Sequence, residues 1–60
     1  MKAGEEVTVT CYGGIRERRT LVSVENGVLF VCRPEEYRVA AQENREPICI
    51  GFHPEDVDES

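Results

Sequence analysis

The pattern of apolar and polar residues along this 60-residue chain predicts four β-strands. In the first stretch, residues 6–12, Val7, Val9 and Cys11 alternate with threonines, which is typical of a half-buried strand. The others are residues 19–25, 28–32 and 48–52. Between the first two strands, residues 13–19 are almost entirely polar and predict a loop or a splayed hairpin tip.

The dipeptide Asn26-Gly27 separates the second and third predicted strands and indicates a two-residue type I′ turn. Such a turn fixes the facing pairs across the hairpin. The expected pairs are Val24 with Leu29, Val22 with Val31, and Leu21 with Cys32. Residues 28–32 are then apolar on both faces, which is typical of a central strand, unless a bulge changes the register.

A single helix is predicted from Pro34 onward. Proline suits the first turn of a helix, and the two glutamates that follow it lie at the positive end of the helix dipole. Tyr37, Ala40 and Ala41 come next at helical spacing, so they predict a narrow face that lies against the sheet. Asn44, followed by a proline, ends the helix after about three turns.

This order of elements predicts a single domain over residues 1–60, of the α+β class and mostly β. Four strands and one short helix are too few for a two-layer sandwich, and there are no βαβ units that would make a parallel sheet. We expect a small barrel or a curled antiparallel sheet of four to five strands, with the helix between the third and fourth. Residues 55–60 form an acidic tail that predicts either a short last strand or a disordered end.

Two segments carry a motif: residues 4–9, Gly-Glu-Glu-Val-Thr-Val, and residues 51–59, Gly-Phe-His-Pro-Glu-Asp-Val-Asp-Glu. They resemble the opening strand and the closing segment of small SH3-like barrel proteins. The resemblance implies a barrel in which one 3₁₀ turn, begun at Pro54, leads to a short last strand. It does not imply recognition of proline-rich peptides, because the chain has no Trp and Val57 stands where peptide-binding SH3 domains carry a tyrosine.

The chain has seven basic and twelve acidic residues, a net charge of −5, and four of the acids lie within residues 53–60. This balance disfavours nucleic acid as a partner, because nonspecific binding depends on neutralising several phosphates at once. The longest uninterrupted apolar run has five residues, and no apolar leader follows Met1. We therefore expect a cytoplasmic protein that does not bind membranes.

Three cysteines, Cys11, Cys32 and Cys49, could combine with His53 as zinc ligands, but the chain lacks the Cys-x-x-Cys pair that structural zinc sites use. An odd number of thiols also argues against a disulfide framework and for a reducing compartment. We expect the cysteines to be packing residues, with no metal or other cofactor. Nucleotide-binding and nucleophile motifs are absent from the sequence, so we do not expect an enzyme.

The best candidate for a binding site is the arginine group Arg16, Arg18 and Arg19, with Tyr12 beside two glycines. A guanidinium next to an aromatic ring can hold a carboxylate or stack on a base. The alternative interpretation is a solvated loop whose arginines offset nearby acids. Phe52 and Pro54, at the end of the last clear strand, complete the set of candidate partner-binding residues.

These observations predict a noncatalytic binding or accessory module that recognises a protein partner, or a second copy of itself, through a loop or a sheet edge. The small core favours such a partner, because 24 apolar residues in 60 give a domain of this size little margin of stability. Two alternatives stay open: a nucleic-acid-binding barrel that uses the arginines, and a small metal or redox protein that uses the three cysteines.

Overall fold

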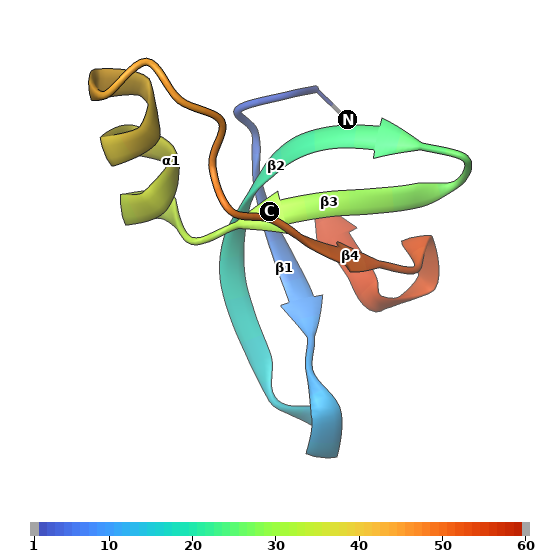
Figure 1. The fold of residues 1–60 in the computed structure, drawn as a ribbon. Coiled ribbons are helices and arrows are strands. Elements are labelled where there is room, and N and C mark those ends of the chain that lie inside the picture. The colour runs from blue at the N-terminus through green and yellow to red at the C-terminus, as the bar shows by residue number, and fades with distance from the viewer. Residues whose placement is uncertain (1, 60) are drawn as a thin grey trace.

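The computed structural model describes residues 2–59, which fold into one open, five-stranded antiparallel sheet with a single α-helix (Figure 1). The strand order across the sheet is β4-β3-β2-β1-β5. The elements are β1 Glu6–Thr10, β2 Arg16–Glu25, β3 Val28–Cys32, α1 Pro34–Gln42, β4 Ile50–Phe52, β5 Val57–Glu59 and the 3₁₀ turns η1 Tyr12–Gly14 and η2 Pro54–Asp56. The chain is therefore mostly β, with its helix between the third and fourth strands, as the sequence predicted.

The sheet curls around one apolar core. Alternate residues of β1, Val7 and Val9, point to the same face and are completely buried there, together with Leu21 of β2. Both outer strands contribute to this core, since Val57 of β5 is buried in it and Phe52 of β4 packs against it. In the described part of the chain β4 pairs with β3 and β5 pairs with β1, so the sheet wraps one core without its outer strands being joined.

The turn between β2 and β3 is the predicted one. Asn26 has φ 53° and Gly27 has φ 77°, and a type I′ turn needs positive φ at both central residues. Val24 pairs with Leu29, as expected from this turn. The strand β3 lies between β2 and β4, which explains why its residues are apolar on both faces.

A bulge in β2 makes the other two predicted pairs wrong. The register shifts between Leu21 and Ser23, so Leu21 pairs with Val31, and Cys32 pairs with Thr20. The extra residue keeps Leu21 on the core face, where it is only 1% exposed. An unbroken register would have placed this leucine on the opposite face of the sheet.

The first hairpin is tighter than predicted, because residues 16–19 belong to β2 and not to a loop. Pairing runs from Glu6 opposite Thr20 to Thr10 opposite Arg16, and the turn is confined to residues 11–15. Two consecutive glycines with positive φ make this short reversal sterically allowed. As a result, the three candidate arginines lie on a strand.

The helix α1 and the C-terminal segment follow the prediction with two differences. Ala40 is buried and Tyr37 is partly buried, but Ala41 is exposed and was wrongly placed on the packed face. The last long strand was expected at 48–52, whereas β4 begins at Ile50. Within the acidic tail, residues 57–59 form β5, which is the strand alternative, and Ser60 lies outside the described residues.

Candidate functional site

The two outer strands of the sheet differ in how they are protected. β5 carries two acidic side chains in three residues, and charges of this kind discourage further strands from pairing. β4, with the sequence Ile-Gly-Phe, carries no charge, and Ile50 is 64% exposed. The outer edge of β4 therefore lacks the charges that protect the edge of β5.

A pocket of about 310 Å³ opens beside this edge, and we refer to it as the β4 pocket. Ile50 pairs with Val31 and Phe52 pairs with Leu29, so the β4 side chains lie on the same face as the core. Ile48, just before the strand, is 77% exposed. The pocket is lined by Cys11, Arg19, Val31, Cys32, Arg33, Glu36, Ile48, Ile50 and Phe52.

Three charged residues line the β4 pocket, and among the described residues only two of them are paired with an oppositely charged side chain. Arg19 Nη1 donates to Glu17 Oε2 at 3.3 Å and to the carbonyl oxygen of Arg18 at 2.7 Å. Glu36 is held by Arg45, which lies outside the pocket. Arg33, which is exposed, has no ion pair among the described residues. The pocket is therefore apolar at its base and has an unmatched positive charge at its rim.

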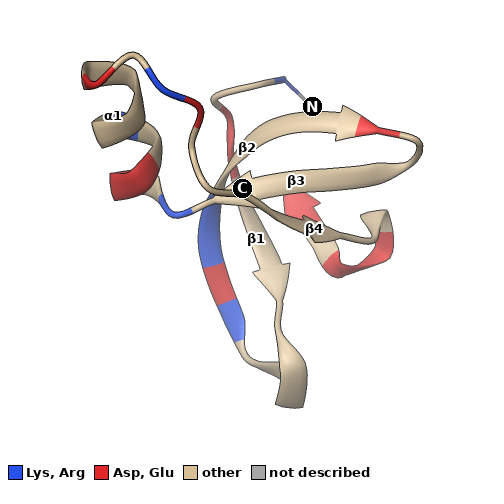
Figure 2. Ribbon diagram, viewed as in Figure 1, with Lys and Arg blue, Asp and Glu red and all other residues tan. Residues whose placement is uncertain are grey.

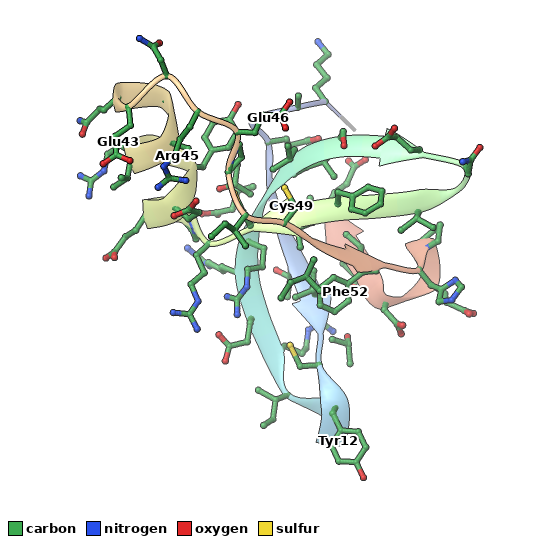
Figure 3. The ribbon with its side chains drawn as sticks, viewed as in Figure 1. Tyr12, Glu43, Arg45, Glu46, Cys49 and Phe52 are labelled. Atoms are coloured by element: carbon green, nitrogen blue, oxygen red, sulfur yellow. The ribbon has the colours of Figure 1, made fainter. Side chains whose placement is uncertain are left out.

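Glu36 connects α1 to the segment that leads into β4. Its Oε2 accepts a hydrogen bond from Arg45 Nη1 at 2.6 Å and another from the backbone N–H of Ile48 at 3.0 Å. These two hydrogen bonds, that from Arg45 first, lower the pKa of Glu36 below its ordinary value. Figure 3 shows Arg45 beside the helix at the start of this segment. The carboxylate thus fixes the position of Ile48 at the pocket.

The candidate residues chosen from the sequence are not gathered into one site. Tyr12 is fully exposed at the tip of the first hairpin, whereas Phe52 lies in β4, away from this tip (Figure 3). Arg19 and Phe52 both line the β4 pocket. Pro54 is exposed and begins η2, outside the residues that line the pocket.

Each of the three candidate arginines has an acidic neighbour. Arg16 Nη2 lies 2.6 Å from Asp58 Oδ2, and Arg18 Nη1 lies 3.6 Å from Glu6 Oε1. The third, Arg19, is paired with Glu17 as described above. Figure 2 shows this alternation of positive and negative residues along the lower part of β2. The arginines of β2 are thus balanced locally, an arrangement that does not favour a polyanion.

The three cysteines occupy different environments. Cys32 is buried, whereas Cys11 and Cys49 are half-buried, and all three are free thiols. Burial is the main reason why the pKa of the Cys32 thiol is raised, with smaller contributions from Cys49 and Glu36. Across residues 2–59, no three His, Cys, Asp or Glu side chains come together in a way that could hold a metal ion.

The sequence did not single out Ile48, Ile50 or Arg33 as functional residues. The two isoleucines alternate with the residues between them, and this pattern predicted a face packed in the core. Only the sheet order shows that β4 is an outer strand, and this depends on contacts that a single sequence does not reveal.

Comparison of the chain with protein-family models, with curated proteins and with solved structures finds no significant match. None of the helices formed by residues 2–59 has the length and apolar character needed to cross a membrane.

Proposed function

We propose that this domain is a noncatalytic binding module that takes up an extended segment of a partner protein along β4. The observation that carries the proposal is the uncharged outer edge of β4, with Ile50 exposed on it and an apolar pocket beside it. Extended peptides add to exposed sheet edges through main-chain hydrogen bonds, and pockets for alternate side chains give specificity. Exposed apolar surface of this kind is typical of interaction sites.

The charges favour a particular kind of segment. Arg33 is unmatched at the rim of the β4 pocket, and the base of the pocket is apolar. A segment with an apolar side chain for the pocket and an acidic side chain one or two positions away would complement both features. A second copy of this chain fits less well, because both copies would carry a net charge of −5 and repel each other.

On this proposal the fold is an SH3-like barrel that is open between its outer strands. The strand order and the contribution of both outer strands to one core support the comparison with such barrels. Small barrels that bind through a sheet edge need a rigid sheet behind it. The hydrogen bonds that Glu36 accepts supply part of this rigidity, because one of them comes from the backbone N–H of Ile48, two residues before β4.

Selection from a library of random peptides displayed on phage tests the proposal. We expect the wild-type domain to enrich peptides with an apolar residue near an acidic one. Ile50→Asp should abolish the enrichment, because it places a charge on the pairing edge. Val24→Asp is the matched control: Val24 is also an exposed β-branched strand residue, but it lies near the β2–β3 turn and does not line the β4 pocket.

Two results would contradict the proposal. One is equal enrichment by wild type and Ile50→Asp. The other is concentration-dependent self-association of the wild-type domain in sedimentation experiments that Ile50→Asp removes, since the edge would then serve a second copy.

A further inference from the structure

Cys32 and Cys49 come from opposite ends of the segment that joins β3 to β4. The pairing of these strands runs Leu29 with Phe52, Phe30 with Gly51, and Val31 with Ile50. Cys49 comes one residue before β4, and continuing the register by one residue would set it opposite Cys32. Figure 3 shows Cys49 where the chain passes the end of β3 before entering β4.

The two thiols also lie on the same face of the sheet. Side chains alternate along a strand, so Cys32 is on the face of Phe30, opposite to the core residue Val31. Cys49 borders a hollow on that face together with Phe30 and Pro47. Burial is the main reason why the pKa values of both thiols are raised, with smaller contributions from Glu36 to each of them and from Cys49 to Cys32.

We propose that Cys32 and Cys49 form a site for reversible thiol oxidation, at which a disulfide links β3 to β4. Directly opposed residues of antiparallel strands have Cα atoms about 4.5–5.5 Å apart, and disulfides need about 4.4–6.8 Å. Cys11 borders the β4 pocket, as Cys32 does, but it packs against the core and has no place opposite Cys32 in the register of β3 with β4. The pair is thus specified by the fold, although three cysteines are present.

The oxidant is a small disulfide such as oxidised glutathione. The half-buried Cys49 thiolate attacks one glutathione sulfur, an S–S bond forms to Cys49, and the first glutathione thiolate leaves. The Cys32 thiolate then attacks Cys49 Sγ, which releases the second glutathione thiolate. The two cysteines lose two electrons and two protons in total. These electrons and protons are taken up by the two molecules of reduced glutathione that leave.

The disulfide would act as a staple. It closes the loop that contains α1 and ties the unprotected outer strand to a central strand, so it restricts the unfolded chain. A domain of this size has a small hydrophobic core, and disulfides are a common way to stabilise such small domains. The effect does not depend on the peptide-binding proposal.

Peptide mapping tests the site. Native protein is incubated with oxidised glutathione, free thiols are alkylated, and the chain is cut after Lys and Arg without reduction. Arg33 precedes a proline and resists cleavage, so the three cysteines fall on separate peptides, residues 3–16, 20–38 and 46–60. We expect peptides 20–38 and 46–60 to be joined and peptide 3–16 to be alkylated at Cys11.

Two variants make the result specific. Cys11→Ser should keep the cross-link, and Cys49→Ser, at a half-buried position, should abolish it. Oxidation should raise the Tm of wild type and of Cys11→Ser by roughly 10 °C or more, and leave Cys49→Ser unchanged. Links that involve Cys11 in native protein, glutathione adducts without a link, or an unchanged Tm after linking would overturn the proposal.

Discussion

At the scale of single residues, Glu36 of α1 also binds residues that lie outside its own helix. As the third residue of α1 it favours the positive end of the helix dipole, which the sequence indicated. It also accepts hydrogen bonds from Arg45 and from the N–H of Ile48, nine and twelve residues further along the chain. One carboxylate therefore joins the helix, the segment after it and the start of β4.

Acid should weaken this junction. The pKa of Glu36 is lower in the folded chain than its ordinary value of 4.5, so its contribution to stability is complete above that value and is lost as the pH falls through the lowered one. We expect Glu36→Gln to lower the Tm by a few degrees at neutral pH and to reduce the loss of Tm below about pH 4.5. Circular dichroism melts over a pH series measure both effects.

Glu35→Gln is the control for this experiment, since Glu35 lies in the same helical turn and has no hydrogen bond to Arg45 among the described residues. It should keep the wild-type dependence on acid. If both variants melt alike at every pH, the hydrogen bonds of Glu36 do not stabilise the fold.

At the scale of elements, the local signals in the sequence were reliable, but the register of the β2–β3 hairpin beyond its first pair was not. The turn at Asn26-Gly27, the limits of β3 and the start of α1 at Pro34 were all predicted correctly, because each depends on residues close together in the chain. The bulge in β2 was not, although Leu21 needs it to reach the core. Its cause lies in the packing of several strands.

The candidate site shows the same limit. Of the candidate partner-binding residues, Arg19 and Phe52 border the β4 pocket, whereas Arg16 and Arg18 are paired with acids that are distant in sequence or on the neighbouring strand. The inference that Cys32 faces Cys49 depends on the register of β3 with β4, continued by one residue. A helix separates these strands, and so no turn fixed that register in advance.

A glycine in β4 provides a test of this register. A Cβ atom at Gly51 would lie 2.9 Å from Val28 Cγ1 and 3.3 Å from Phe30 Cε1. Gly51→Ala should therefore cost about 1–3 kcal/mol of unfolding free energy, as measured by urea denaturation. Val28→Ala removes the atom in closest contact. The loss of unfolding free energy in the double variant should therefore be smaller than the sum of the losses in the two single variants. Simple additivity would show that Gly51 does not face these side chains.

At the scale of the whole molecule, one curled sheet supports two outer strands with different properties. β5 is acidic and packs Val57 into the core, whereas β4 is uncharged and leaves Ile50 in solvent beside a pocket. The positive charge unmatched at that pocket is Arg33, while the arginines of β2 are balanced by nearby acids. This asymmetry favours a protein segment at β4 over a nucleic acid on β2.

A nuclear magnetic resonance titration tests this central claim most directly. The ¹⁵N-labelled domain is titrated with a peptide enriched in the library selection, and the shifts of the backbone amides are mapped. Our account predicts the largest shifts at residues 48–52, with smaller ones at Cys11, Arg19 and Arg33, which border the same pocket. Shifts centred on Tyr12 and Arg16, with residues 48–52 unchanged, would contradict it.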